Sequence, residues 1–151
     1  KWAFSPYERK VKKLSEQHKE RIIFTGYMDN AEVYQYASVA DVQCVPTLIE
    51  EAAPLTVLEA MAEGLPLIVT KSGGVAEYVD ESTALTIGKE NAVKDLSRAI
   101  CYMKEHPEVR KKMSDAARKQ SKKYDEAIYY KNFIEVIDKI IDENREITND
   151  N

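Results

Sequence analysis

Short apolar runs and helical apolar stripes alternate along the first half of this chain. Each run is continuous in apolar character, which is typical of strands buried on both faces, and each ends in Gly, Pro or a polar loop. The runs predict strands at residues 21–26, 42–46, 65–70 and 84–87. Because helices are predicted between them, we expect an α/β domain whose Rossmann-like parallel sheet is flanked by helices. Ligands bind such sheets at the carboxyl ends of the strands.

Capping and turn residues mark where the helices begin and end. They predict helices at about 6–17, 30–40, 54–63 and 75–79, and a helical segment of three helices after Gly88. The residues that carry these signals are Ser5, Pro6, Glu8, Asp29, Asn30, Pro54, Gly64, Pro107 and Asp125. The apolar residues that we expect to face the core are Val33, Tyr36, Ala37, Ala40, Val93, Leu96, Ile100, Met103, Val109, Met113, Ala116 and Ala117.

The last predicted helix has a long apolar face, formed by Tyr130, Phe133, Ile134, Ile137, Ile140 and Ile141. We expect part of this face to be exposed and to favour weak self-association. Residues 1–141 are predicted to form one domain, and the polar tail 142–151 is predicted to fray. The chain begins at Lys1 without Met, and no element precedes the aromatic residues Trp2 and Phe4. We therefore expect it to be a truncated part of a longer protein.

Composition and charge exclude several classes of protein. The chain is 44% hydrophobic and 32% charged, as in ordinary globular domains. Its net charge of −4 argues against a nucleic-acid partner. No apolar run approaches the roughly 18 residues of a membrane span. Cys44 and Cys101 lack metal-ligand spacing and are interpreted as buried thiols in a reducing compartment. No metal or cofactor is expected.

The segment between the second and third predicted strands is the most informative part of the sequence. A strand ends at Pro46, a loop follows, and a helix begins at Pro54. Because Pro lacks an N–H, the first free donors of this helix are expected at Leu55 and Thr56. The amino terminus of a helix at the carboxyl edge of a parallel sheet favours anions through its free N–H groups and its dipole. This segment therefore predicts a phosphate site.

Two carboxylates flank the predicted phosphate site. Glu51 lies in the loop and Glu59 in the helix, with seven residues between them. In related sheets one carboxylate accepts hydrogen bonds from the ribose hydroxyls. A second carboxylate on the other side of the phosphates would be placed to hold sugar hydroxyls. The pattern predicts a site for a nucleoside diphosphate sugar, although acids that merely complement the helix dipole remain an alternative.

The same segment resembles a known family. Glu51 and Glu59 match the E-x7-E motif of retaining glycosyltransferases with the GT-B architecture, which form glycosyltransferase family 4, or glycosyl transferases group 1. The flanking sequences ADVQCVPT, LTVLEAMAEGLPLIVT and SGGVAEYV are similar to that family's pattern in order and spacing. The resemblance covers residues 21–130. It implies the carboxyl-terminal, donor-binding domain of such an enzyme.

The resemblance also implies roles for the matching residues. Glu51 would be the catalytic residue that binds the donor sugar, and Glu59 would bind the ribose. Glu50 competes with Glu51 for the first motif position, but its spacing from Glu59 is one residue too long. The distal phosphate would be held by the backbone of Ala53, Pro54, Leu55 and Thr56. The nucleobase would lie along Gly26, Tyr27 and Met28.

The family pattern is not complete in this chain. An Arg and a Lys that neutralise the donor diphosphate are expected in an upstream segment, and nothing before Arg21 matches it. We therefore expect the first strands and the amino-terminal, acceptor-binding domain to lie outside this chain, which would be inactive by itself.

The implied parent enzyme is a cytoplasmic hexosyltransferase, at the membrane periphery in its full-length form. It would transfer sugar from a nucleoside diphosphate sugar to an acceptor glycan or glycolipid. The Asp-x-Asp metal motif is absent from the sequence, in line with a metal-independent mechanism. The main alternative is a non-catalytic α/β module that binds phosphate or nucleotide.

Overall fold

The computed structural model describes residues 5–149, with side-chain environments through residue 143. Lys1, Trp2 and Phe4, on which the expected truncation partly rests, lie outside the described residues. The chain divides into two units, Lys1–Tyr34 and Gln35–Asn151. The single domain expected for residues 1–141 stays a prediction.

The first unit contains the expected amino-terminal helix. α1 (Pro6–Ser15) begins with a capping box, in which Glu8 N–H donates to Ser5 Oγ (3.2 Å) and Ser5 N–H donates to the Glu8 carboxylate (2.6 Å). A short 3-10 helix, η1 (Glu16–His18), continues it. The next helix, α2 (Asn30–Val39), is capped in the same way by Asp29 and Glu32, as the sequence predicts at Asp29. Both starts are therefore local features of the sequence.

The strand predicted at residues 21–26 is wrong. The N–H groups of Arg21 and Ile22 both donate to the His18 carbonyl, so this segment leaves η1 through a turn. Ile23 is 79% exposed, and no residue of 21–26 pairs with a strand in the described part of the chain. An apolar run forms a strand only where partner strands and a packed face are present.

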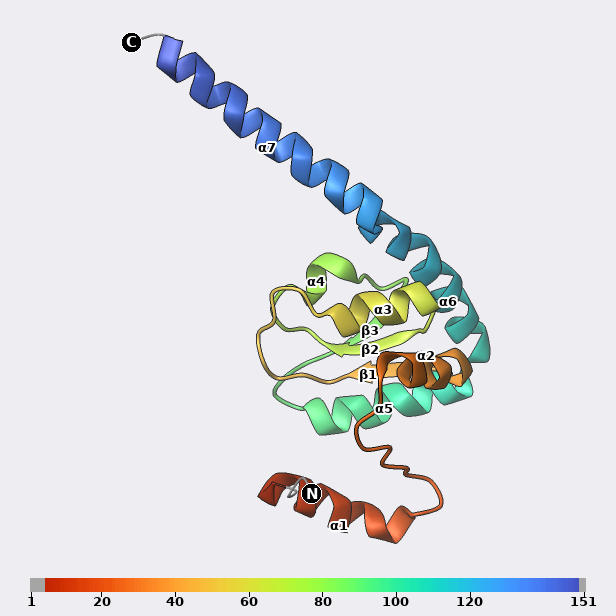
Figure 1. Ribbon diagram of the computed structural model, residues 1–151. Helices are drawn as coiled ribbons and strands as arrows, with labels where there is room; N and C mark the ends of the chain where they lie inside the picture. Colours follow the sequence, from red (N-terminus) through yellow and green to blue (C-terminus); the bar gives the residue numbers. More distant parts are fainter. Residues whose placement is uncertain (1–4, 150–151) are drawn as a thin grey trace. The chain divides into compact units, whose positions relative to one another are not determined.

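Three parallel strands form the sheet of the second unit, in the order β1 (Gln43–Val45), β2 (Leu67–Thr70) and β3 (Ala84–Ile87) (Figure 1). The pairing aligns Val45 with Val69 and Thr70 with Ile87. All four residues of β2 are buried, as the continuous apolar run predicts. The predicted parallel α/β fold is confirmed, with three of the four expected strands.

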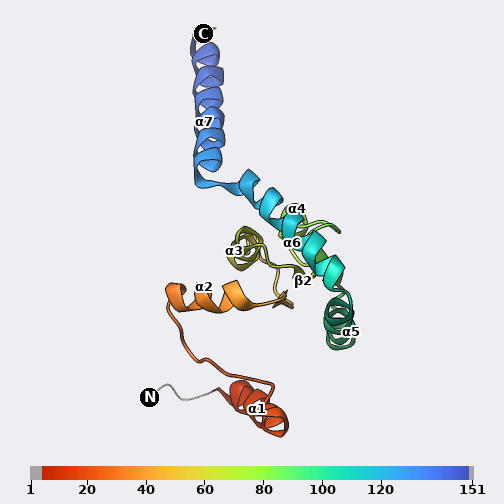
Figure 2. The same cartoon turned by 90° about the vertical axis from the view of Figure 1, so that its right-hand side faces the viewer.

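Helices cover both faces of this sheet. Figures 1 and 2 show α3 (Leu55–Glu63) and α5 (Ala92–Glu105) on opposite sides of β2. Leu67 and Val69 face the α3 side, and Ile68 packs with Met103 of α5. α6 (Pro107–Ser121) contributes to both clusters, and the short α4 (Val75–Tyr78) follows β2. The central strand is thereby buried between two apolar layers.

Several predicted inward faces differ from the structure. The predicted face of α6 is confirmed, with Met113 and Ala117 buried. On α5, however, small Ala99 lies against the sheet, so the larger Val93 and Ile100 fall at the margin of the buried stripe and are exposed. Residues with an unexpectedly exposed position also include Val33, Tyr36, Ala40, Cys44 and Cys101. Apolar spacing does not show which side of a helix a partner covers.

The last helix, α7 (Glu126–Asn149), follows η2 (Lys122–Tyr124) and is capped by Asp125, whose carboxylate accepts from Ala127 N–H (2.9 Å). α7 continues beyond residue 142, and the fraying expected for residues 142–151 stays a prediction. Ion pairs one turn apart, such as Lys139–Glu143 (3.9 Å), support the helix near this point. Part of its apolar face is exposed as expected, at Tyr130, Phe133, Ile137, Ile140 and Ile141.

Gly64 should be required where α3 ends. Its φ of 74° is left-handed, and its N–H donates to the carbonyls of Ala60 and Met61. A Cβ at this position would also overlap the Arg118 side chain. We expect Gly64→Ala to lower the free energy of unfolding by about 1–2 kcal/mol in urea titration, because the left-handed conformation disfavours a side chain. Gly88→Ala is the control, since a Cβ there meets nothing within 4 Å. Equal midpoints for both variants would contradict this account.

Candidate functional site

The carboxyl ends of the three strands bring three loops to one edge of the sheet. Residues 46–54 follow β1, residues 71–74 follow β2 and residues 88–91 follow β3. Because the strands are parallel, all three loops leave the sheet in the same direction (Figure 1). The predicted sugar and phosphate residues belong to the first of these loops and to the start of α3.

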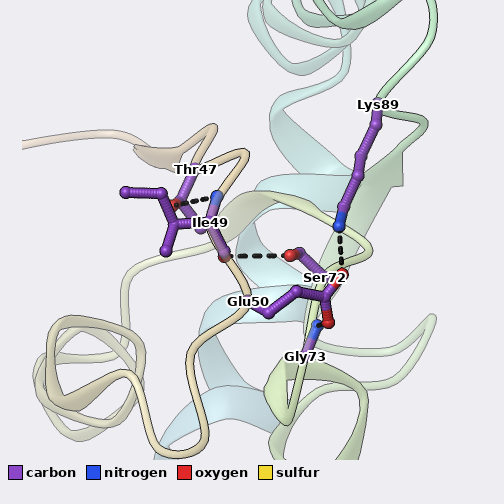
Figure 3. A network of polar contacts seen from close by, with 6 residues as sticks. All are labelled: Thr47, Ile49, Glu50, Ser72, Gly73 and Lys89. Atoms are coloured by element: carbon purple, nitrogen blue, oxygen red, sulfur yellow. Dashed lines mark hydrogen bonds and ion pairs between the residues drawn. The ribbon is translucent and has the colours of Figure 1, made fainter.

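Hydrogen bonds join the first loop to the second. Ser72 Oγ donates to the Ile49 carbonyl (2.9 Å), and Gly74 N–H donates to the Glu51 carbonyl (2.8 Å). Within the first loop, Ile49 N–H donates to Thr47 Oγ1 (3.2 Å). Figure 3 shows the Ser72–Ile49 and Ile49–Thr47 hydrogen bonds at the point where the two loops meet. The backbone on both sides of Glu50 is therefore held in place by the loop that follows β2.

The two glycines allow the two backbones to approach this closely. Gly73 has a φ of 52°, and a Cβ there would overlap the Glu51 backbone. A Cβ at Gly74 would overlap the carbonyl oxygen of Ala52. The structure thus gives the Gly73–Gly74 pair a packing role in the loop.

Glu50 connects all three loops. Its carboxylate accepts a hydrogen bond from Gly73 N–H (2.9 Å) and forms an ion pair with Lys89, beyond β3 (Figure 3). The hydrogen bond from Lys89, the bond from the Gly73 amide and the positive charge of Lys89 together lower the pKa of Glu50 below its usual value. In the sequence, Glu50 is only a rival for the first motif position, and no motif includes Lys89. The sequence feature that could have identified Lys89 is its position directly after Gly88, at the end of a predicted strand.

Glu51 and Glu59 both have exposed side chains. Neither carboxylate has a hydrogen bond or ion pair to another side chain within residues 5–143. Glu59 lies one turn beyond Thr56, and these two residues share the exposed face of α3, whereas Val57 and Ala60 face the core. The site therefore presents two carboxylates that are available to accept hydrogen bonds from hydroxyl groups.

The start of α3 differs slightly from the prediction. Pro54 is the N-cap and not the first helical residue, and it is buried. Its carbonyl accepts from Val57 N–H (3.0 Å), so Val57 is not a free donor. The N–H groups of Leu55 and Thr56 make no hydrogen bond to the described residues, and both residues are exposed. Two donors thus remain open at the positive end of the helix, where anions are favoured.

The predicted nucleobase segment lies in the other unit. Gly26 has a left-handed φ of 71°, Tyr27 is 96% exposed, and Met28 is half-buried. The Thr25 hydroxyl donates to the Gly26 carbonyl (3.3 Å). The role of this loop remains a prediction.

Two pockets, of about 350 and 340 Å³, are lined by other residues. The first includes Gly64 and Pro66, which lie between the end of α3 and the start of β2. Both include Asp41 and Arg110, which form an ion pair (3.4 Å). Neither contains Glu51 or Glu59. We favour the carboxyl edge of the sheet, where the loop that carries Glu51 leads into the start of α3.

Residues 5–143 contain no cluster of three or more His, Cys, Asp or Glu side chains placed to hold a metal ion. In the described part of the chain, no helix is both long and apolar enough to cross a bilayer.

Known proteins resemble this chain in sequence and in fold. The family model described as "Glycosyl transferases group 1" matches residues 5–120. A lipopolysaccharide 1,2-N-acetylglucosaminetransferase from Salmonella typhimurium is 26% identical over 66% of this chain and 28% of its own length. A sulfoquinovosyl transferase from Arabidopsis thaliana is 30% identical over 68% of this chain and 21% of its own length. The chain thus spans less than a third of these curated relatives.

A solved structure provides a further comparison. The sucrose-phosphate synthase of Thermosynechococcus elongatus superposes with a TM-score of 0.69 and 26% sequence identity. The match covers 80% of this chain and 31% of that protein. The α/β arrangement described above is therefore the arrangement of a GT-B domain.

Gly74 offers a direct test of the contact between the loops. We expect Gly74→Ala to lower the free energy of unfolding by about 1–3 kcal/mol. The new methyl group must displace the Ala52 carbonyl and weaken the Gly74–Glu51 hydrogen bond. Urea titration measures this change. Gly88→Ala is again the matched control, and a Gly74→Ala variant as stable as this control would contradict the packing role.

Proposed function

The chain belongs to the glycosyl transferases group 1 family, and on this premise we propose that it is the donor-binding part of a retaining glycosyltransferase. One observation carries the proposal. The unpaired Glu51 and Glu59 lie on either side of a helix start whose first N–H groups are open, at the carboxyl edge of the parallel sheet. This combination suits a ligand with hydroxyl groups at both ends and phosphates between them.

Each part of the donor has a proposed partner. Glu51 is the catalytic residue and accepts hydrogen bonds from hydroxyls of the sugar. Glu59 accepts hydrogen bonds from the ribose. The distal phosphate is held at the α3 start, by the backbone of Ala53, Pro54, Leu55 and Thr56. Support for the phosphate position comes from the open N–H groups of Leu55 and Thr56 and from the helix dipole.

The nucleobase is proposed to lie along Gly26, Tyr27 and Met28. The exposed Tyr27 and the left-handed Gly26 support this assignment, since such a loop offers backbone groups to a flat ligand. The assignment follows from the family resemblance.

The proposed reaction transfers a hexose to an acceptor hydroxyl with retention of anomeric configuration. The bond between the anomeric carbon and the phosphate oxygen breaks, and a bond from that carbon to the acceptor oxygen forms on the same face. The acceptor proton passes to the departing phosphate, so no side chain acts as nucleophile. The protein contributes positioning and stabilises the charge that develops on the leaving group, as the α3 start is suited to do. No metal is required in this scheme.

The acceptor is proposed to be a glycan or glycolipid that binds a second domain of the full-length enzyme. The name of a Campylobacter jejuni relative, 25% identical over 74% of this chain and 29% of its own length, specifies a diphospho-undecaprenol substrate. The name of the Salmonella typhimurium relative specifies lipopolysaccharide. These names support an acceptor that is linked to a membrane lipid, and we place the enzyme in the cytoplasm at the periphery of the membrane.

Calorimetry on the full-length protein tests the donor site. The probes are UDP, GDP and three donors, namely UDP-glucose, UDP-N-acetylglucosamine and GDP-mannose. We expect Glu59→Gln to weaken both the nucleoside diphosphate and its sugar donor by about tenfold or more, because a charge-assisted hydrogen bond is lost. Glu51→Gln should weaken the sugar donor by about as much and leave the nucleoside diphosphate within about twofold.

Glu63→Gln is the control, because Glu63 lies on the same helix one turn beyond Glu59 and outside the proposed contacts. A protein that binds none of the probes, or whose binding does not depend on Glu59, would disprove the proposed function. Binding of nucleoside diphosphate without any preference for its sugar donor would instead favour a non-catalytic nucleotide-binding module. Proton NMR of the product would show whether the anomeric configuration is retained.

A further inference from the structure

The second glutamate of the Glu50-Glu51 pair is the proposed sugar ligand, yet the first makes the more specific contacts in the structure. The Glu50 carboxylate accepts from Gly73 N–H (2.9 Å), and the Glu51 carbonyl accepts from the next amide, Gly74 N–H (2.8 Å). Lys89 forms an ion pair with the same Glu50 carboxylate. Two consecutive residues of the first loop thus contact two consecutive amides of the second.

We propose that Glu50 and Lys89 are positioning residues that orient Glu51 toward the sugar of the donor. This inference rests on the function proposed above for Glu51. In this arrangement the carboxylate of Glu50 is occupied, whereas that of Glu51 is exposed and has no side-chain partner within residues 5–143. The two neighbouring acids therefore have different roles: Glu50 holds the loop in place and Glu51 binds the ligand.

The phosphate-binding part of the site has separate attachments. Pro54 is buried, and its carbonyl accepts from Val57 N–H (3.0 Å). The Gln43 side chain of β1 donates to the Thr56 carbonyl (3.1 Å). None of these contacts involves Glu50 or Lys89. Loss of the Glu50–Lys89 pair should therefore disturb the sugar side of the site and leave the nucleotide side in place.

The alternative is that the pair only stabilises the fold. The side chains of Lys89 and Glu50 are 37% and 70% exposed, and ion pairs at such positions contribute little to global stability. A purely structural role therefore predicts small changes in the free energy of unfolding. It predicts no difference between the affinity for a nucleotide sugar and that for the nucleoside diphosphate. A positioning role predicts that the affinity for a nucleotide sugar falls while the affinity for the corresponding nucleoside diphosphate is kept.

Three variants separate the two contacts of Glu50. Lys89→Met removes the ion pair alone. Glu50→Gln removes the same ion pair by neutralising the carboxylate, but it keeps an oxygen that can accept from Gly73 N–H. Glu50→Ala removes both contacts. Lys71→Met is the matched control, since Lys71 follows β2 at the same edge and its side chain has no hydrogen bond or ion pair to the described residues.

The measurement is calorimetry on the full-length protein, with UDP-glucose, UDP-N-acetylglucosamine and GDP-mannose compared against UDP and GDP. For the sugar donor that binds wild type most tightly, we expect a loss of about threefold in Lys89→Met and Glu50→Gln, and about tenfold or more in Glu50→Ala. Combining Lys89→Met with Glu50→Gln should cost no more than either alone, because both remove the same interaction. Affinity for the nucleoside diphosphate should stay within about twofold of wild type, and Lys71→Met should bind like wild type.

The results that would overturn the inference differ from those that would overturn the proposed function. If wild-type binding depends on Glu59 but Glu50→Ala binds the sugar donor normally, the positioning role is wrong and the donor site stands. Equal losses for sugar donor and nucleoside diphosphate would also reject it, as would a loss that follows a lowered unfolding midpoint in urea. If no probe binds, or if Glu59→Gln has no effect, the proposed function fails and the inference fails with it.

Discussion

The parallel pairing of β2 with β1 on one side and β3 on the other is the constraint on which the rest of the second unit depends. It buries every residue of β2 and sends Leu67 and Val69 to one apolar layer and Ile68 to the other. Parallel strands also end at one edge, so the three loops that follow them have to share that edge. Without this pairing, residues 46–54, 71–74 and 88–91 would have no reason to meet. The candidate site is thus a consequence of strand direction before any side chain is considered.

Contact between the loops then depends on the absence of side chains as much as on their presence. Gly73 and Gly74 lie so close to the backbone of Glu51 and Ala52 that a Cβ at either glycine would overlap it. The same close approach lets two consecutive amides reach a carboxylate and a carbonyl of the facing loop. Ser72 adds a third bond to this contact. A loop held in this way can present an unpaired carboxylate without losing its shape, which is what ligand recognition requires.

Elements whose causes are local were predictable from the sequence, and those whose causes are distant were not. The Ser5 and Asp29 caps and the left-handed Gly64 each follow from a few neighbouring residues, and the continuous apolar run of β2 predicts its burial from its own positions. Residues 21–26 have the composition of a strand, but a strand also needs a partner strand, and composition does not show whether one is present. The Glu50–Lys89 pair joins residues that are 39 positions apart, so it becomes visible only when strand order and loop paths are known. The roles proposed for Glu51, Glu59 and the α3 start come from the motif and from their position at the carboxyl edge of the sheet.

The charge balance at this edge bears on how a nucleoside diphosphate sugar could bind there. Glu50 and Lys89 neutralise each other, which leaves the negative Glu51 and Glu59 beside the phosphate position. The α3 start offsets only about half an elementary charge. A diphosphate carries at least two negative charges and would enter an edge whose own balance is not positive. In the proposed site, charge-assisted contacts worth about 1.5–3 kcal/mol each would therefore have to come from cations outside these loops. Under the proposed assignment the carboxylates would select the sugar and ribose, while most of the affinity for the diphosphate would come from outside the loops described here.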